Sequence, residues 1–529
     1  MPLRRALAAV TLLALFGLRP AGVAVAQPPG TLTYRTITKA ELDDRVRGGW
    51  AGQMIGVSFG APTEFKSNGK IIEGDLPVWK PGNVENAIDQ DDLYVEMTFA
   101  AVMDRIGLDA TTEEYGEAFR TSKYQLWHAN AAARRLLETG IKAPWSGHPK
   151  YNVHANDIDF QIEADFIGLM SPGLPNAARD YSMRVGQVMN FGDGIYGGLF
   201  VTGMYAAAFF ESDVRRVVEA GLALMPQGSS YAAIIRDVLA WHAADPTNWK
   251  TTWQKIQEKW DVEDSCPDGS LRPFNIDARL NGAYIALGLL YGEGDFARTL
   301  EVTTRAGQDS DCNPSNAVGI LGVMLGYDRI PDVWKSGIPA LKARKFAFTD
   351  YAFDDIVAST LRRAEKVVIA AGGEVTADGF RIPPQAPVPP ILEQWDMGVP
   401  DRIIEAGDAA WQWSDGWTTP AARSDGTPTR GRVATAAGAE ATLRFTGTAI
   451  TITGRYAADG GKADVLLDGK PLHGINAWIP ERTHDNALWH VYGLDPGPHE
   501  VRIKTTMPGD TRSTGSTVLV NGAIVYRAR

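Results

Sequence analysis

An excess of basic residues is absent from this sequence. Its 52 Lys and Arg are outnumbered by 63 Asp and Glu, which gives a net charge of −11. A nucleic-acid partner would need a basic face, so this balance argues against one. After the N-terminal stretch, the sequence also lacks any segment long and apolar enough to span a membrane. With 529 residues, 44% of them hydrophobic, the chain can bury a large core and form more than one domain.

Cysteine is scarce as well, because the sequence contains only Cys266 and Cys312. An exported protein could join the two in a disulfide and use it structurally. However, Cys312 lies within an acidic turn, where a disulfide would compete with a functional site. The sequence also has no set of His and Cys residues with the spacing of a zinc site. The pairing of the two cysteines therefore stays open.

The N-terminus has the features of an export signal. Arg4 and Arg5 are followed by Ala6–Leu18, an apolar stretch too short to cross a bilayer. Ala24-Val25-Ala26, before Gln27, has the small-x-small pattern of a cleavage site. We therefore predict a signal peptide at residues 1–26 and a secreted, soluble protein. The paired arginines leave a twin-arginine route open, although the surrounding residues fit it poorly.

Hydrophobic periodicity divides the rest of the chain into two domains and a linker. Over residues 27–378 apolar residues recur at spacings of three and four, which predicts an all-α domain. GFRIPPQAPVPP begins a Pro-rich linker at residues 379–399. Over residues 400–529 short alternating stretches such as ATLRFTGTAITITGR are separated by Gly, Pro and Asp turns, which predicts an all-β sandwich.

Two acidic stretches and a glycine stripe are the candidates for chemistry. Glycine recurs every four residues in GGWAGQMIGVSFGAPTEF, which indicates close helix packing. Ala61-Pro62 ends the stripe, and Glu64 just after it is either a surface residue or a placed ligand. Asp91 and Asp92 open an apolar helix in DQDDLYVEM, and Asp309 and Asp311 precede another in RAGQDSDCNPSNAVGILGVMLG. Each stretch alone could be an ordinary helix start. Buried together, four carboxylates would need a cation or raised pKa values, and oxygen ligands favour Mg²⁺, Mn²⁺ or Ca²⁺ over zinc.

These three blocks, in this order, resemble the ADP-ribosylglycohydrolase family, which includes the dinitrogenase-reductase-activating glycohydrolases. The resemblance covers residues 38–340, and IPDVW at Ile330–Trp334 near its end also looks like the family's ending. It implies a compact all-α fold with one or two Mg²⁺ or Mn²⁺ ions, and cleavage at the anomeric carbon of ADP-ribose.

By motif, the resemblance implies that Asp91, Asp92, Asp309 and Asp311 are metal ligands, and that Glu64 matches the acidic residue after the glycine block. The expected catalytic residues are Glu64, Asp92 and Asp309. Several positions depart from the family pattern. Gln90 and Cys312 occupy positions where the family usually has hydroxyl ligands, and we retain both as candidate metal ligands. Leu93 stands where the family has Thr, and Val57 where it has an acidic residue.

The middle of the helical domain supplies candidate substrate contacts. DFQIEADFIGLMSPG offers Glu163 and Asp165, which are either site carboxylates or ordinary polar helix positions. The glycine-rich loop NFGDGIYGG precedes a helix, and its backbone N–H groups could bind phosphate or sugar hydroxyls. Because Asp193 would repel a phosphate, sugar contacts are more natural. The loop candidates are Asn190, Gly192, Asp193 and Gly194.

The strand-rich region resembles the galactose-binding-like and carbohydrate-binding modules of exported glycoside hydrolases, in FTGTAITITG, ADVLLDGK and LDPGPHEVRI. Trp411, Trp413, Trp417 and Trp478 are either sugar-stacking platforms or sandwich core. The polar surroundings of Trp413 and Trp417 favour solvent exposure for these two.

The resulting hypothesis is a secreted, metal-assisted glycoside hydrolase. Its substrate would be a furanosyl unit in an extracellular glycan, a nucleoside or an ADP-ribosyl conjugate. The alternative is a cell-wall glycan-binding protein whose helical domain has lost catalysis.

Overall fold

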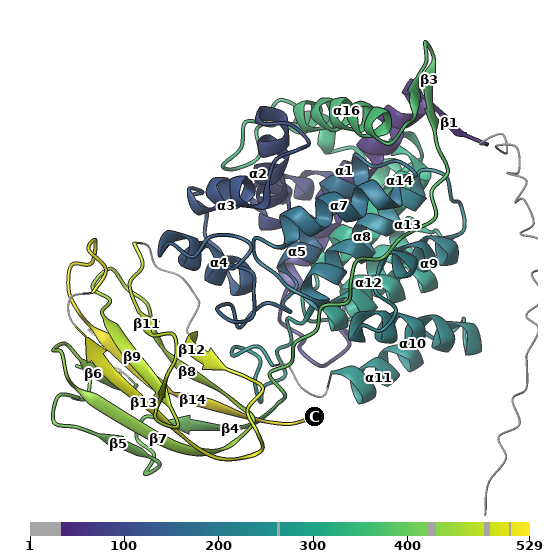
Figure 1. The fold of residues 1–529 in the computed structure, drawn as a ribbon. Coiled ribbons are helices and arrows are strands. Elements are labelled where there is room, and N and C mark those ends of the chain that lie inside the picture. Colours follow the sequence, from purple (N-terminus) through teal and green to yellow (C-terminus); the bar gives the residue numbers. More distant parts are fainter. Residues whose placement is uncertain (1–32, 262–264, 422–429, 481–486, 507–508) are drawn as a thin grey trace, which may run out of the picture. The chain divides into compact units, whose positions relative to one another are not determined.

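The computed structural model describes residues 33–261, 265–421, 430–480, 487–506 and 509–529 (Figure 1). Residues 34–529 form one compact unit. The predicted signal peptide, residues 1–26, lies outside the described residues. Among the residues described, no helix has both the length and the apolar character needed to cross a membrane.

The part of the chain up to Ala370 is helical, as predicted, and we call it the helical region. Its α-helices are α1 (Lys39–Gly60), α2 (Asp91–Arg105), α3 (Thr112–Arg120), α4 (His128–Glu138), α5 (Asp159–Ile162), α6 (Asp165–Leu169), α7 (Pro175–Gly186), α8 (Asp193–Ala208), α9 (Val214–Leu224), α10 (Ser230–Ala244), α11 (Trp249–Trp260), α12 (Ala278–Gly292), α13 (Phe296–Arg305), α14 (Cys312–Leu325), α15 (Asp332–Lys335) and α16 (Phe353–Ala370). Short 3₁₀ turns are η1 (Ala61–Thr63), η2 (Pro81–Asp89), η3 (Tyr327–Arg329) and η4 (Ile338–Ala340).

The glycine stripe of α1 packs directly on the backbone of α14. A Cβ on Gly48 would lie 2.2 Å from the Gly322 carbonyl oxygen, and a Cβ on each later glycine of the stripe, one turn further along α1, would lie similarly close to a backbone oxygen. A Cβ on Gly52 would meet Val318 O at 2.2 Å, one on Gly56 would meet Pro314 O at 2.4 Å, and one on Gly60 would meet Ser310 O at 2.0 Å. Each glycine lowers the stability of the helix by about 1 kcal/mol relative to alanine, but it lets the two backbones touch. This contact fixes the start of α14 against the end of α1.

The described residues from Val399 onwards form strands, which we call the β region, and two antiparallel sheets confirm the predicted sandwich. One sheet has the order β10-β9-β13-β7-β5, with β11 beside β9; the other has the order β12-β8-β14-β4, with β6 beside β14. The strands are β4 (Val399–Glu405), β5 (Trp411–Trp413), β6 (Arg432–Ala434), β7 (Glu440–Gly447), β8 (Ala449–Arg455), β9 (Lys462–Leu467), β10 (Lys470–Pro471), β11 (Ile475–Asn476), β12 (Ala487–Val491), β13 (Gly497–Thr506) and β14 (Val518–Arg527).

The tryptophans of the β region are mostly part of its interior. Trp411, Trp417 and Trp478 are buried, and Trp413 is partly buried and stacks on Trp411 with ring centroids 4.7 Å apart. The expectation that Trp417 faces solvent is therefore wrong. Its polar neighbours in the sequence are turn residues, while its indole packs edge-on against Trp413, with centroids 5.0 Å apart.

The predicted linker begins with a strand. β3 (Gly379–Ile382) pairs antiparallel with β1 (Arg35–Thr38) and with β2 (Glu374–Val375). The Pro-rich segment after it lies against the helical region: Arg179 Nη1 donates to Val388 O at 2.6 Å, and Glu393 N donates to the Tyr196 hydroxyl at 2.6 Å. The boundary at residues 379–399 stays a prediction.

Candidate functional site: a buried carboxylate cluster

The start of α14 and the start of α2 bring their carboxylates together. The ligand atoms of Asp309, Asp311 and Cys312 all lie within 4.8 Å of one another. The Cys312 thiol donates a hydrogen bond to Asp92 Oδ1 at 3.1 Å, which joins α14 to α2. Asp92, Asp309 and Asp311 are each at most 2% exposed, and Asp91 is partly buried. We call Asp91, Asp92, Asp309 and Asp311 the carboxylate cluster.

Glu64 lies at the solvent side of this cluster. The residues on either side of it are tied to the loop before α14: the Thr63 and Ser310 hydroxyls are 2.7 Å apart, and Phe65 N donates to Gln308 O at 3.0 Å. Because η1 follows the glycine stripe directly, the α1–α14 contact sets the position of Glu64 relative to Asp311. The residue keeps contact with solvent, unlike the aspartates beneath it.

The carboxylate cluster has buried oxygens without protein donors. Asp92 Oδ2, Asp309 Oδ1 and Asp311 Oδ1 have no hydrogen-bond partner among the described residues. A buried anionic oxygen without a donor costs free energy, and several such oxygens side by side cost more because they repel one another. Hard divalent cations would satisfy oxygens of this kind, since Mg²⁺ and Mn²⁺ prefer carboxylate oxygens. The side chains present therefore fit a site for such an ion.

The electrostatics of the cluster show the same unbalanced negative charge. Burial, followed by the charges of Asp91 and Asp311, raises the pKa of Asp92 well above its usual value. Burial, then the charge of Asp311, likewise raises the pKa of Asp309 well above its usual value and that of Asp91 to about 6. Partial burial, with the charges of Asp311 and Asp91, raises the pKa of Glu64 to about 8. A bound cation would reverse these shifts by stabilising the ionised forms.

A second layer of buried polar groups lies beneath the cluster. Asp165 accepts hydrogen bonds from the Tyr205 hydroxyl at 2.5 Å and from Asn316 Nδ2 at 2.7 Å. Glu163 accepts a hydrogen bond from the Asn130 side-chain amide. Burial, then the charge of Asp159, raises the pKa of Glu163, and Asp91 and Asp92 raise it further. Glu163 and Asp165 are thus fully buried near the cluster, and their role as substrate contacts stays a prediction.

Two acidic residues of this layer, Glu96 and Asp159, were not candidates from the sequence alone. Glu96 is fully buried, accepts a hydrogen bond from Phe166 N at 2.8 Å, and lies one turn after Asp92 on the same helix face. Asp159 accepts from Ala129 N at 3.1 Å and from Asn130 N at 2.9 Å, at the start of α4. The four-residue spacing of Asp92 and Glu96 was a usable signal, whereas no local pattern connects Asp159 with α4.

The remaining predicted residues make hydrogen bonds within the protein. Gln90 Nε2 donates to Asn86 Oδ1 at 3.0 Å. Asn190 Oδ1 accepts from Phe160 N at 3.0 Å, and its amide donates to Ala155 O and Asp157 O. Asp193 accepts from Tyr231 N at 3.1 Å. Their roles in binding metal or substrate stay predictions.

The glycines of this loop have packing roles. Gly192 has a φ of +55°, which favours glycine, and a Cβ on Gly194 would lie 2.3 Å from Ala155 O. Their role in binding substrate also stays a prediction.

The two cysteines do not form a disulfide with each other. Cys312 contacts Asp92, and Cys266 Sγ lies 3.3 Å from His154 Nδ1. Both thiols are buried. Burial, then the charges of Asp309 and Asp311, raises the pKa of the Cys312 thiol well above its usual value, so it acts as a neutral donor.

The solved structures that are similar to this chain match it at low sequence identity. No curated protein matches the chain. Among solved structures, an ADP-ribosylglycohydrolase-related protein complex matches at 16% identity over 62% of this chain and 99% of that chain, with a TM-score of 0.38. A family two carbohydrate esterase from Clostridium thermocellum in complex with cellohexaose matches at 19% identity over 21% of this chain and 30% of that chain, with a TM-score of 0.15. A family 35 carbohydrate binding module from an environmental isolate matches at 14% identity over 23% of this chain and 90% of that chain, with a TM-score of 0.16.

The family comparison spans more than half of the chain. The model of the family described as ADP-ribosylglycohydrolase matches residues 38–365, which include the glycine stripe, Glu64, and all four aspartates of the carboxylate cluster. The chain is a member of the ADP-ribosylglycohydrolase family.

Proposed function

We propose that this protein is a metal-assisted glycoside hydrolase that cleaves at the anomeric carbon of a furanosyl, ribose-like unit. The observation that carries the proposal is the set of buried oxygens Asp92 Oδ2, Asp309 Oδ1 and Asp311 Oδ1, which have no donor in the part of the chain that the structure describes, beside a solvent-side Glu64. A buried group of anions open to a ligand, with a further carboxylate at its mouth, suits a reaction that develops positive charge on a sugar ring. Family membership supports action on glycosyl bonds.

Asp91, Asp92, Asp309 and Asp311 would hold one or two Mg²⁺ or Mn²⁺ ions. When bound, such an ion supplies positive charge that orients sugar hydroxyls and polarises oxygen atoms next to it. Cys312 keeps Asp92 in place through its thiol hydrogen bond. The predicted ligand role of Gln90 belongs to the same proposal.

Glu64 would transfer the proton in the reaction. The bonds of Thr63 and Phe65 to the loop before α14 hold its backbone at the mouth of the cluster, where it can reach both water and a bound sugar. In this position it would take a proton from the attacking water as a general base. The ionised carboxylates beneath the ring would stabilise the oxocarbenium-like transition state electrostatically.

The proposal extends to the substrate and the place of action. The N-terminal segment with Arg4, Arg5 and the Ala24-Val25-Ala26 site supports export, so the substrate would be an extracellular furanoside, a nucleoside or an ADP-ribosyl conjugate. The β region would bind glycan or position the protein on it. Because Trp411, Trp417 and Trp478 are buried, this binding would use other side chains.

A substrate screen tests the proposal. Aryl furanosides, nucleosides and ADP-ribose conjugates are incubated with the full chain, with and without Mg²⁺ or Mn²⁺, and release of the leaving group is measured. We expect hydrolysis of one class that depends on the ion, and a fall of about 10²–10⁴ for Glu64→Gln.

The matched control is Glu365→Gln, an exposed carboxylate of α16, which should hydrolyse at the original rate. An ion that binds with no hydrolysis of any class would contradict the proposal and favour a glycan-binding protein.

A further inference from the structure

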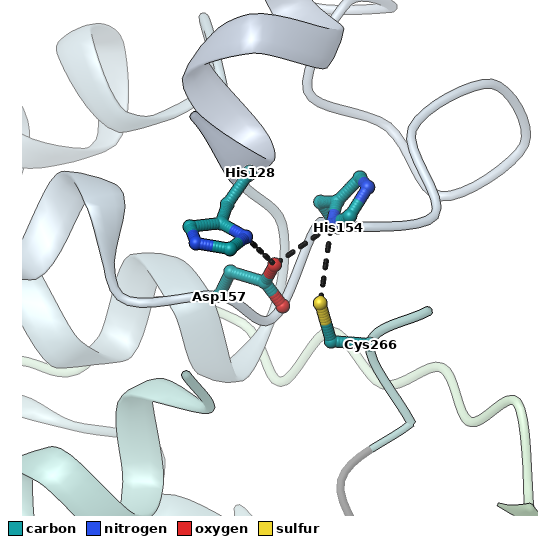
Figure 2. A group of neighbouring side chains, drawn as sticks. All are labelled: His128, His154, Asp157 and Cys266. Carbon is teal, nitrogen blue, oxygen red and sulfur yellow. Dashed lines mark hydrogen bonds and ion pairs between the residues drawn. The ribbon is translucent and has the colours of Figure 1, made fainter. Parts of the chain in front are cut away.

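A second group of potential metal ligands lies elsewhere in the helical region. Figure 2 shows His128, His154, Asp157 and Cys266 around one point, and their ligand atoms all lie within 4.8 Å of one another. His128 is the first residue of α4, His154 and Asp157 come from the segment between α4 and α5, and Cys266 comes from the segment between α11 and α12. We call these four residues the His–Cys cluster. The sequence shows no zinc spacing because folding, not sequence proximity, brings these residues together.

The distances within the His–Cys cluster suit a tetrahedral ion. His154 Nδ1 lies 2.8 Å from Asp157 Oδ2 and 3.3 Å from Cys266 Sγ, and His128 Nδ1 lies 3.8 Å from Asp157 Oδ2. With ordinary Zn–N, Zn–O and Zn–S bonds, the edges of a tetrahedral site are about 3.3–3.6 Å long. These three distances bracket this range, and the other pairs of ligand atoms lie within 4.8 Å of one another, so small shifts of the side chains would complete the site.

The ring nitrogens of the cluster each face more than one neighbouring group. His154 Nδ1 faces both a carboxylate and a sulfur, and one N–H can donate fully to only one of them. His128 Nδ1 lies 3.5 Å from Asp268 Oδ2 and 3.8 Å from Asp157 Oδ2, which is long for a hydrogen bond. An ion at the centre would bind both ring nitrogens at once.

The backbone of His128 gives an independent observation. Its φ is +43°, in the left-handed region that non-glycine residues rarely adopt. Such a conformation costs about 1–3 kcal/mol and is found where the position of a side chain matters to function. Here it directs the His128 imidazole towards Asp157 (Figure 2).

We propose that His128, His154, Asp157 and Cys266 bind one zinc ion. Two imidazole nitrogens, one thiolate and one carboxylate form a borderline-soft ligand set that suits Zn²⁺ and not Mg²⁺. The thiol loses its proton to solvent as the Zn–S bond forms, and the zinc is neither oxidised nor reduced. All four ligand positions are supplied by protein, as in structural zinc sites.

The zinc would stabilise the wall of the carboxylate site. His128 is followed directly by Ala129 and Asn130, whose N–H groups bind Asp159, and the Asn130 side chain binds Glu163. An ion that fixes His128 would therefore fix the start of α4 and the groups that bind these two buried acids. Its loss should lower the melting temperature and loosen the second layer, without removing any ligand of the carboxylate cluster.

Cobalt substitution tests the proposal. The full chain is stripped with a chelator and titrated with Co²⁺ in excess Mg²⁺, which occupies the carboxylate cluster. We expect one Co²⁺ per chain, with the visible bands of a tetrahedral ion and a thiolate-to-cobalt charge-transfer band in the near ultraviolet. Zn²⁺ should displace the Co²⁺ and remove both.

The two cysteines supply matched variants, since the chain has no others. Cys266→Ser should remove the charge-transfer band, and Cys312→Ser should retain it. No such band in the original chain, or a band that disappears with Cys312→Ser and persists in Cys266→Ser, would overturn the proposal.

His128→Gln covers the case in which Cys266→Ser does not fold. It should weaken Co²⁺ binding more than about tenfold, because loss of even an outer partner costs about 10–100-fold. Unchanged Co²⁺ affinity in a folded His128→Gln protein would also overturn the proposal.

Discussion

The carboxylate cluster and the His–Cys cluster lie in the same helical region but differ in chemistry and in how they are assembled. The first consists of acidic side chains at the starts of α2 and α14, aligned by the packing of α14 on α1. The second combines nitrogen, sulfur and oxygen atoms from α4 and from segments outside regular structure. Hard and borderline-soft ligand sets select different ions, so one chain can hold both without exchange between them. Changes confined to one cluster should therefore leave metal binding at the other intact.

The largest effect is expected from Asp309→Asn. It removes one charge of the carboxylate cluster and should abolish Mg²⁺ and Mn²⁺ binding, as measured by calorimetry and elemental analysis, with hydrolysis falling at least about 100-fold. Without metal, the melting temperature should stay the same or rise, because one buried acidic group that is costly to ionise is lost.

Asp91→Asn should have the same effect on metal content, and Co²⁺ binding to the His–Cys cluster should persist in both variants. Unchanged Mg²⁺ stoichiometry would remove Asp309 and Asp91 from the set of ligands.

Gly60→Ala should disturb the carboxylate cluster through helix packing and leave the His–Cys cluster unaffected. Its Cβ would lie 2.0 Å from Ser310 O, so the loop before α14 must move. We expect a loss of stability of about 1–3 kcal/mol and weaker Mg²⁺ binding, with Co²⁺ binding at the His–Cys cluster retained. Chemical denaturation and metal titration measure the two effects.

The control is Gly74→Ala, because among the described residues, its chain neighbours aside, no atom lies within 4 Å of a Cβ placed there. Equal effects of the two substitutions would contradict the role given to the α1–α14 contact.

The metal-free protein should lose stability as the pH rises. Burial raises the pKa of Asp165 to about 8, whereas in the unfolded chain an aspartate has a pKa of about 3.9. Below pH about 4 both states hold the proton; above it the unfolded chain releases a proton that the folded chain keeps. Stability is therefore lost at about 1.4 kcal/mol per pH unit from this group, until the pH passes about 8.

The raised pKa of Glu64 acts in the same direction. As the pH rises from about 5 to about 8, the melting temperature of the metal-free protein should fall, and it should fall less with Mg²⁺ present. A metal-free profile that rises over this interval would mean that these acids are ionised in the fold.

The smallest expected effect comes from Cys312→Ser. A hydroxyl donates to Asp92 Oδ1 more strongly than a thiol and is a harder ligand, so Mg²⁺ affinity should rise by about 2–10-fold. The same substitution at Cys266 should remove soft-metal binding, so one chemical change would have opposite results in the two clusters. A fall in Mg²⁺ affinity would show that the sulfur itself matters at the carboxylate cluster.

The sequence supports prediction of the carboxylate cluster because its signals are local. Adjacent or alternating aspartates before an apolar run, and glycines at every fourth position, report helix starts and helix contacts within short windows. Those windows correctly predicted an all-α region, a sandwich, and the close approach of α1 to another helix. Glu64 follows from the same block, since α1 ends at Gly60, just before the 3₁₀ turn that contains Pro62.

The His–Cys cluster could not be found in this way. His128 and His154 lie on different segments, and Cys266 is 112 positions from His154. Each of these residues has an ordinary interpretation in its own sequence context. The prediction that Trp417 faces solvent was wrong for a related reason. Its sequence neighbours are typical of a turn, but Trp413 and strands distant in sequence decide how its indole packs. Contacts that join distant segments leave no periodic signal.

The packing of α1 on α14 also sets the order in which the site can be completed. Thr63 and Ser310 share a hydrogen bond across 247 positions of the chain. During synthesis, α1 is made early and must wait for α14 before its glycine face is covered. Until α14 is synthesised, the glycine face of α1 stays uncovered. Contacts between residues so far apart in sequence also form slowly. An incomplete chain that ends before residue 309 would therefore carry Glu64, Asp91 and Asp92 but could not form the carboxylate cluster, so such a product should bind neither Mg²⁺ nor substrate.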